Sequence, residues 1–510
     1  MCTRTLLLVL AMASACMPSV ADLSTRVYAC KLDGECNDGR CIDGTCVAAG
    51  SDALRVTFAP QSGPAGTVLS IECSAVTNAT GFVVGGTPAL LLSRTGTTAR
   101  VMVMPGTRSG PVGVLTRTGS LTSPNDFIHS AEAPPTLVRG ARLPAPQGVS
   151  EQAGFGRALA LDAEGRTLVS STQLDTVTGG SAWVYRRDAS AWRQQGGALA
   201  ASSSEMLRYF AAGVAIDSSG ETVAVSGGSA ANESGASIVF VRDGGAYQAA
   251  SAPLVAYTNG YRYEGVSASL SADGRTLVHG IINSGSGAGA GLFSRGDDGG
   301  WNPQGTALRV GGNTGYGLRS LFAGLDFSGT VMLVTAWRDA DGIAHGWVFE
   351  NGWGDVTELV AADSTGVASS PYDVNRVGGA LSGDGHTAVL LGMRNEEGLA
   401  TSLWVFHADP QWAQLGSRID APLRTVEGKP AVAVSTEGTW LVVGGSNLAG
   451  DRGAVAVYAR DGGSWGLVGA PLELPVAVNS VAISADGRSV VAGSDTADEY
   501  EGTVWVLAAP

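Results

Sequence analysis

The sequence predicts an all-β chain in which a seven-bladed β-propeller follows a small β-sandwich and a short cysteine-rich segment. Three observations support this prediction. The 510 residues include 73 glycines and only 15% charged residues, which is typical of many tight turns and few long surface helices. Short apolar runs alternate with polar residues at period two, which indicates half-buried strands. From about residue 134 onward, one turn pattern also recurs at a nearly constant spacing.

The recurring turn reads LDAEGRTL in its first copy and ISADGRSV in its last. Consecutive copies are separated by 55, 54, 55, 56, 53 and 49 residues, a period that holds about four short strands. Four strands per repeat are typical of a propeller blade, and a closed ring leaves no unpaired end. We number the copies as repeats one to seven by their turn glycines, which are Gly165, Gly220, Gly274, Gly329, Gly385, Gly438 and Gly487.

The predicted propeller spans residues 134–510, and its closure follows from a mismatch between its two ends. Repeat seven ends after its third strand, GTVWVLAAP, whereas a fourth-strand pattern occurs before repeat one, at residues 136–143. An exposed third-strand edge invites aggregation. We therefore expect residues 136–143 to pair antiparallel with residues 502–508 and to complete the last blade.

Repeat one carries Gly154-Phe155-Gly156-Arg157-Ala158, followed by ALDAEGRTLVSS and GGSAWVYRRD. This resembles the FG-GAP repeat of integrin-type propellers and their bacterial relatives, although only the first copy keeps Phe-Gly. The family's repeats bind calcium through a D-x-D-x-D-G loop, but the loops here carry at most two carboxylates, too few for Ca²⁺. We expect no metal and no cofactor, and instead side-chain-to-backbone turn bonds where serine replaces the first acid, at Ser271, Ser382, Ser435 and Ser484.

Residues 53–129 contain about seven short apolar runs separated by Gly and Pro, a spacing that suggests a β-sandwich. The opening run from Pro60 to Thr67, PQSGPAGT, resembles the start of the IPT/TIG immunoglobulin-like domain. Gly85-Gly86-Thr87-Pro88-Ala89 and Asn125-Asp126-Phe127 continue the resemblance, which implies an Ig-like fold for this unit. Cys73 lies in an apolar run without an evident partner, so we expect a free, buried thiol.

Residues 22–50 hold four cysteines within a segment too short to build a core. Disulfides are the expected staple in an exported chain, and three connectivities remain open. A zinc site is the alternative, but the spacing lacks CxxC pairs. The expected disulfide cysteines are Cys30, Cys36, Cys41 and Cys46.

Residues 1–21 are typical of an export signal, with Arg4 before a short apolar run. Two processing sites remain open. Ala13-Ser14-Ala15-Cys16 resembles a lipobox, in which Cys16 would be lipidated, and Ser19-Val20-Ala21 fits ordinary cleavage. We therefore expect a bacterial outer-membrane or cell-surface lipoprotein, or a secreted protein, with membrane contact only through a lipid anchor. The net charge of −14 argues against nucleic acid as a partner.

The long, variable connections of the repeats are expected on one face of the ring, a common place for recognition. Asp495–Glu501 reads as an acidic surface loop on that face. We expect a protein or glycan to bind there, through Tyr257, Tyr261, Tyr316, Tyr372, Asp339 and Asp341.

The five histidines follow no metal or catalytic spacing, and His386 is expected to be an exposed turn residue. The chain is accordingly predicted to be a non-catalytic binding or adhesion protein rather than an enzyme. The alternative is an exported carbohydrate-active hydrolase or lyase with its site at the central mouth of the propeller. Carboxylates at that mouth would favour the enzyme, and an apolar or tyrosine-lined rim would favour binding.

Overall fold

The chain divides into two compact units, Met1–Ala131 and Glu132–Pro510. The structure is a computed structural model. It describes residues 31, 39–42, 45–48, 55–146, 149, 153–172, 180–188, 191–201, 210–227, 236–256, 262–283, 287–305, 307–310, 318–338, 343–350, 352–361, 378–394, 400–424, 431–447, 452–497 and 502–508.

Eight strands of the first unit follow one another in the order β3-β5-β8-β7-β6-β9-β10-β4. Neighbouring strands are antiparallel except for β10 and β4, which are parallel. The strands are β3 (Thr57–Ala59), β4 (Ser62–Gly63), β5 (Val68–Glu72), β6 (Gly81–Val84), β7 (Thr87–Thr95), β8 (Thr98–Met102), β9 (Gly110–Leu115) and β10 (Ser120–His129).

Strand β7 joins the two halves of this path. Its first residues pair with β6, and its later residues pair with β8 beyond a bulge between Leu91 and Ser93. One buried cluster draws residues from both halves, including Phe58 of β3 and Phe127 of β10, whose ring centroids are 6.5 Å apart. The apolar alternation of the sequence therefore produces one core shared by both halves.

Cys73 lies directly after β5 and before the 3₁₀ helix η3 (Ser74–Asn78). It is buried and free, which confirms the expectation for this thiol. Burial raises its pKa, so the thiol is protonated and unreactive at neutral pH. Earlier in the same unit, β1 (Gly39–Ile42) and β2 (Thr45–Ala48) form an antiparallel pair in which Cys41 lies opposite Cys46.

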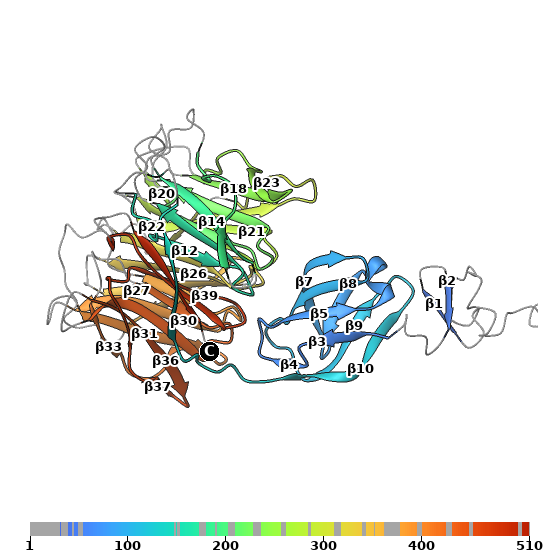
Figure 1. The fold of residues 1–510 in the computed structure, drawn as a ribbon. Helices are drawn as coiled ribbons and strands as arrows, with labels where there is room; N and C mark the ends of the chain where they lie inside the picture. The colour runs from blue at the N-terminus through green and yellow to red at the C-terminus, as the bar shows by residue number, and fades with distance from the viewer. Residues whose placement is uncertain are drawn as a thin grey trace, which may run out of the picture. The chain divides into compact units, whose positions relative to one another are not determined.

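The second unit consists of antiparallel sheets that follow the repeats (Figure 1). Strands β33 and β35 pair over two residues and join two of these sheets. The strands are β12 (Leu159–Leu161), β13 (Thr167–Thr172), β14 (Ser181–Asp188) and β15 (Ala191–Gln194); β16 (Gly213–Ile216), β17 (Thr222–Gly227), β18 (Ala236–Asp243) and β19 (Ala246–Ala249); β20 (Arg262–Leu270), β21 (Thr276–Asn283), β22 (Gly287–Arg295), β23 (Trp301–Pro303) and β24 (Leu308–Val310); β25 (Leu318–Leu325), β26 (Met332–Arg338), β27 (Ile343–Glu350) and β28 (Asp355–Val360); β29 (Gly378–Leu381), β30 (Thr387–Arg394), β31 (Ala400–Ala408), β32 (Trp412–Gln414) and β33 (Ile419–Arg424); β34 (Ala431–Val434), β35 (Trp440–Asn447), β36 (Gly453–Asp461), β37 (Ser464–Leu467) and β38 (Leu472–Leu474); and β39 (Ser480–Ile483), β40 (Ser489–Ser494) and β41 (Thr503–Ala508).

The sheet of β39, β40 and β41 is completed by a strand from the beginning of the unit. Strand β11 (Val138–Pro144) pairs antiparallel with β41, the pairing expected above for residues 136–143 and 502–508. Arg142 Nε donates to Thr503 Oγ1 at 3.0 Å, and the guanidinium carbons of Arg139 and Arg142 lie 5.5 and 5.9 Å from the ring centre of Trp505. These contacts add cation–π attraction to the strand pairing.

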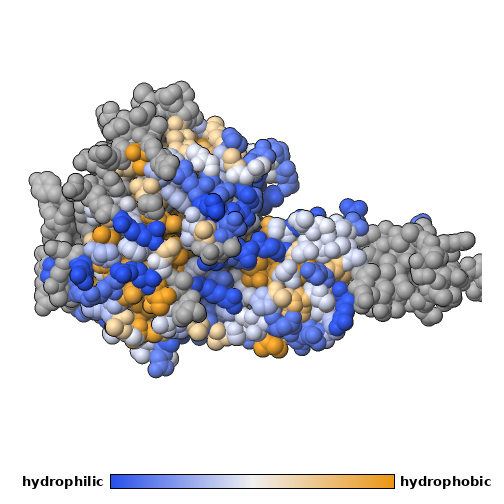
Figure 2. Space-filling model, in the orientation of Figure 1, coloured by the Kyte–Doolittle hydropathy of each residue, from blue (hydrophilic) through white to orange (hydrophobic). Residues whose placement is uncertain are grey.

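The core of the second unit lies between neighbouring sheets. One cluster joins Trp183 and Tyr185 of β14 to Val491 of β40 and Val504 of β41. Sheets from opposite ends of the repeat array therefore pack against each other. In this unit the exposed large apolar residues of strands, Val138, Val356, Val360 and Leu467, lie on outer strands, and on the face in Figure 2 orange residues are scattered among blue ones.

The seven repeat turns are joined in a closed circle of hydrogen bonds. Each turn begins with an Asp or a Ser, and one of the two residues that follow it is hydrogen-bonded to the equivalent part of the next turn. The turn of repeat seven is bonded in the same way to that of repeat one. The bonds run from Ala163 N to Ser218 O, Ser218 N to Ala272 O, Ala272 N to Phe327 O, Phe327 N to Gly383 O, Asp384 N to Thr436 O, Thr436 Oγ1 to Ala485 O and Asp486 N to Ala163 O. Together with the sheets, this circle defines a β-propeller-like all-β fold.

The turn glycines serve two purposes in this circle. All seven have a positive φ, between 60° and 74°, which L side chains rarely adopt. They also lie against the turn of the preceding repeat: a Cβ on Gly438 would lie 2.1 Å from Thr387 Oγ1, and one on Gly165 would lie 2.4 Å from Ser489 Oγ. The recurrent glycine is therefore required by backbone conformation and by close packing.

Candidate functional site

The repeat turns are closed by their own polar side chains, in two patterns. In repeats one, two and four an aspartate accepts backbone N–H groups; Asp326 Oδ1, for example, accepts from Thr330 N at 2.8 Å and Val331 N at 2.9 Å. In repeats three, five and seven a serine takes that place and an aspartate two residues later receives the serine hydroxyl. Ser271 Oγ donates to Asp273 Oδ1 at 2.6 Å and accepts from Thr276 N at 2.9 Å. This confirms the expected side-chain-to-backbone bonds.

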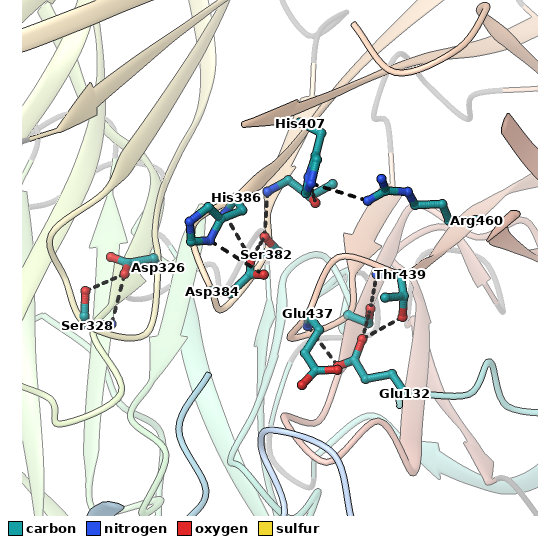
Figure 3. Close-up of polar contacts among 12 residues, drawn as sticks. Glu132, Asp326, Ser328, Ser382, Asp384, His386, His407, Glu437, Thr439 and Arg460 are labelled. Carbon is teal, nitrogen blue, oxygen red and sulfur yellow. Dashed lines mark hydrogen bonds and ion pairs between the residues drawn. The ribbon is translucent and has the colours of Figure 1, made fainter. Parts of the chain in front are cut away.

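Repeat six departs from both patterns, because Ser435 is followed two residues later by Glu437. The missing carboxylate comes from Glu132, at the start of the unit (Figure 3). Glu132 Oε2 accepts from Ser435 Oγ at 2.6 Å and from Thr439 Oγ1 at 2.9 Å, and its Oε1 accepts from Glu437 N at 2.9 Å. Glu132 therefore ties the segment before β11 to the turn of repeat six.

Burial controls the acidity of three of these carboxyl groups. It raises the pKa of Asp162 and Asp217, against the opposing effect of hydrogen bonds from Thr167 and Thr222. It also raises the pKa of Glu132, where bonds from Ser435, Glu437 and Thr439 oppose it. All three carboxyl groups already accept hydrogen bonds within the turns, so their role in this structure is to hold the circle together.

A cavity of about 120 Å³ lies at the turn end of the central axis. Its lining comes from the turns of all seven repeats and from the last residues of the strands that precede those turns. Among these lining residues, Phe327 is the only aromatic one. None of the lining residues carries a titratable side chain: they are Leu161, Ala163, Ile216, Ser218, Leu270, Ala272, Phe327, Leu381, Gly383, Val434, Thr436, Ile483, Ser484 and Ala485. The cavity lining therefore offers apolar and hydroxyl groups but no titratable side chain, and the turn carboxylates described above are engaged in hydrogen bonds of the turns.

Two polar side chains lie near the opposite end of the last repeat, at the ends of β39 and β40 that are remote from the turn. Asn479 precedes β39 and Asp495 follows β40, so both lie at the end remote from the turn. Asn479 Nδ2 donates to Asp495 Oδ1, and Asp495 N donates to Asn479 Oδ1 at 3.4 Å. Asp495 is buried, so the expectation that it belongs to an acidic surface loop is wrong. Asp495 is buried because it lies beside the start of β39, where its carboxylate is hydrogen-bonded to the Asn479 amide.

Arg157 lies on the same side of the fold, before β12. The preceding residue, Gly156, packs on the end of β40: a Cβ there would lie 3.1 Å from Ser494 N, and Ser480 Oγ donates to Gly156 O at 2.6 Å. Arg157 Nη1 is buried. The sequence motif that resembles FG-GAP therefore packs Gly156 on the end of β40, directly before Asp495, and Arg157 follows that glycine in the chain.

Three of the histidines lie apart from one another, and each makes its own contacts with neighbouring side chains. His279 is fully buried and its Nδ1 lies 2.8 Å from Ser237 Oγ, whereas His345 Nδ1 contacts Glu358 Oε1 at 3.0 Å and stacks on Trp347. His407 bridges Thr387 and Arg460, and burial, followed by the Arg460 charge, lowers its pKa (Figure 3).

Ser382, Asp384 and His386 lie in one turn but do not form a nucleophilic triad. Ser382 Oγ donates to Asp384 and accepts from Thr387 N, and His386 is bound to Asp384 rather than to the serine (Figure 3). The His386 side chain is 60% exposed, which confirms its expected place in a turn. The serine hydroxyl is hydrogen-bonded to Asp384 and not to His386, so the serine–histidine pair that activates a nucleophile is missing from this turn.

The loop residues predicted to bind a ligand lie outside the described residues, as do three of the predicted cysteines. Within the described part, no group of three His, Cys, Asp or Glu side chains is arranged to hold a metal ion. Among the same residues, no helix is long and apolar enough to cross a membrane. The predicted positions outside the described part are Cys16, Cys30, Cys36, Tyr257, Tyr261, Tyr316, Tyr372, Asp339 and Asp341.

No protein-family model and no curated protein matches the chain. Solved structures with a similar fold include hydrazine synthase of Kuenenia stuttgartiensis, at 13% identity and a TM-score of 0.48, over 71% of this chain and 98% of that one. A Bacteroides uniformis protein assigned as a 6-phosphogluconolactonase is 12% identical, with a TM-score of 0.44, over 73% and 95%. Oligogalacturonate lyase in complex with manganese is 9% identical, with a TM-score of 0.43, over 74% and 97%.

These similarities concern the fold, and no particular activity is transferred from them. They do contradict the expectation that this chain is not an enzyme, because a lactonase and a lyase are among the proteins of similar fold. The physical reason is that a ring of sheets can bring catalytic side chains together from distant repeats, so the lack of a linear motif does not exclude catalysis. The expectation of a non-catalytic chain is withdrawn.

Proposed function

We propose that this chain is an exported carbohydrate-active hydrolase or lyase that works at the loop-bearing mouth of a seven-bladed propeller. The observation that carries the proposal is the polarity of the two ends of the axis. The cavity at the turn end is lined by Phe327 and other side chains without a titratable group, and the carboxylates of the turns are bound within them, whereas Asp495, Asn479 and Arg157 lie on the opposite side. A reaction that needs an acid or base fits the second end.

In the proposed site, Asp495 acts as the carboxylate acid or base and Asn479 orients it. A lyase would use Arg157 to neutralise a substrate carboxylate while a base removes the neighbouring proton. A hydrolase needs a second carboxylate, for which the loop acids Asp339 and Asp341 are the sequence candidates. Tyr257, Tyr261, Tyr316 and Tyr372 would supply flat surfaces for sugar rings.

The number of blades, the closure of the last blade, the family resemblances and the export of the chain are also part of this proposal. The closed circle of seven turns supports seven blades, and the pairing of β11 with β41 supports closure of the last blade by residues 136–143. The resemblances to FG-GAP and IPT/TIG sequences and the export signal at residues 1–21, with Cys16 as the lipidation candidate, rest on the sequence.

The activity is tested with full-length exported protein and a panel of neutral and acidic polysaccharides. We expect new reducing ends, with ultraviolet absorbance of unsaturated sugars if the enzyme is a lyase. Asp495→Asn should lower the rate by about 100-fold or more, the range for loss of a general acid or base. Asp461→Asn, at an exposed acid of β36, is the control and should keep the rate. Binding without cleavage, or full activity of Asp495→Asn at an unchanged melting temperature, would contradict the proposal.

The cysteines give a separate test of export. The register of β1 and β2 places Cys41 opposite Cys46, so we propose a Cys41–Cys46 disulfide and a second one between Cys30 and Cys36. Peptide mapping of the exported protein without reductant should recover these two linked pairs and an unmodified Cys73. Four free thiols, or one bound zinc ion per chain, would refute this assignment.

A further inference from the structure

The first unit contains a broad polar groove of about 670 Å³. It is formed by the end of η3, the end of β7 and the turn between β9 and β10. Apart from Ala79 its lining is polar and includes no acid: Thr77, Asn78, Thr80, Arg94, Arg117 and Thr118. The groove therefore presents two guanidinium groups among hydroxyl and amide groups.

Both arginines are carried by well-defined backbone. Arg94 Nη1 donates to Ala79 O at 3.1 Å and to Val76 O at 3.3 Å, which fixes its guanidinium at the end of η3. Arg117 is exposed in a turn closed by two bonds to Gly119 O, one from Thr116 N at 2.9 Å and one from Thr116 Oγ1 at 3.0 Å. The Arg94 guanidinium is therefore held in place before any ligand arrives, and Arg117 extends from a closed turn beside it.

The charge of residues 53–129, the part of this unit that carries the groove, differs in sign from that of the whole chain. Residues 53–129 contain five arginines against Glu72 and Asp126, so their formal charge is +3 in a protein of net charge −14. A basic groove on this basic segment attracts anions even though the remainder of the chain repels them. Its volume exceeds that of a simple oxyanion, which indicates a ligand with several polar groups.

We infer that this groove binds an acidic polysaccharide, with Arg94 and Arg117 on carboxylate or sulfate groups and the threonine and asparagine side chains on sugar hydroxyls. Guanidinium groups suit planar and tetrahedral oxyanions, and hydroxyl and amide groups suit sugars. The inference stands on the first unit alone and does not require catalysis by the second.

Affinity electrophoresis of the full-length protein tests this inference. Polygalacturonate, whose anionic groups are carboxylates, and dextran sulfate, whose anionic groups are sulfates, are expected to slow migration at low ionic strength, whereas uncharged dextran should not. The acidic polymer that slows the protein more shows whether the groove prefers carboxylate or sulfate groups. Arg117→Glu should weaken retention by the acidic polymers about tenfold, as expected when one charged hydrogen bond is lost.

Arg108→Glu is the matched control, because Arg108 is an exposed arginine of the same unit that does not line the groove. It should change retention no more than about twofold, since long-range charge effects are modest. Equal weakening by Arg108→Glu and Arg117→Glu, equal retention by dextran, or no retention by either acidic polymer would overturn the inference. Asp495→Asn should bind as the parent does, so failure of the proposed reaction is distinguishable from failure of this site.

Discussion

Gly438→Ala is expected to destabilise the protein by about 3 kcal/mol or more. A non-glycine residue at a φ of 66° costs about 1–2 kcal/mol by itself. The new Cβ would also lie 2.1 Å from Thr387 Oγ1 of the neighbouring repeat, and overpacking of this kind adds about 1–3 kcal/mol. Chemical denaturation followed by tryptophan fluorescence measures the loss.

Gly462→Ala separates the two contributions. Gly462 has a similar φ of 59°, but nothing lies within 4 Å of a Cβ placed there. This control should therefore lose only the backbone contribution, about 1–2 kcal/mol. Equal losses in Gly438→Ala and Gly462→Ala would show that the turns do not pack against one another as described.

Glu132→Ala is expected to lower the free energy of unfolding by about 3 kcal/mol, because it leaves three donors of the repeat-six turn without their acceptor, at about 1 kcal/mol or more each. Glu437→Asp in the same background should restore part of that loss. It recreates the Ser-x-Asp turn in which Ser271 Oγ and Arg275 N bond to Asp273. A double variant no more stable than Glu132→Ala would argue against this account.

The same residue gives a pH dependence. Since burial raises the pKa of Glu132 above its unfolded value, the folded state binds the proton more tightly than the unfolded state. The stabilisation linked to this proton is fully present below the unfolded pKa and is lost as the pH rises through the folded pKa. The free energy of unfolding of the parent should therefore rise relative to that of Glu132→Gln as the pH falls from neutral. A constant difference or the opposite trend would contradict the raised pKa of Glu132.

The repeats could be predicted from sequence because their determinants are local. Each turn needs a positive-φ glycine and an Asp or Ser a few residues earlier, and both appear in the printed pattern. The role of Glu132 was missed because its partner Ser435 is 303 residues away. A signal was present, however: among the four serine-type turns, only that of repeat six lacks an aspartate two residues after the serine.

The candidate site was less accessible to such reasoning. Asp495 has the surroundings of a loop acid in the sequence, and its burial depends on Asn479, 16 residues earlier on the other side of a hairpin. The charge of residues 53–129 was equally hidden, because the total of −14 masks a positive segment. The charge of that segment can be counted once its bounds are predicted, whereas the side-chain pairing of Asp495 and the joining of Arg94 and Arg117 in one groove require the folded arrangement.

The pairing of β11 with β41 has a consequence for synthesis. Arg142 and Thr503 are separated by 361 residues, so the ribosome releases β11 long before the strand that it will border. Throughout that interval the early strand has an unsatisfied edge, and the second unit cannot complete its ring until nearly the whole chain has emerged. Translation pauses or premature release would therefore yield open intermediates with a free strand and a free sheet edge, which are suited to joining one another between molecules.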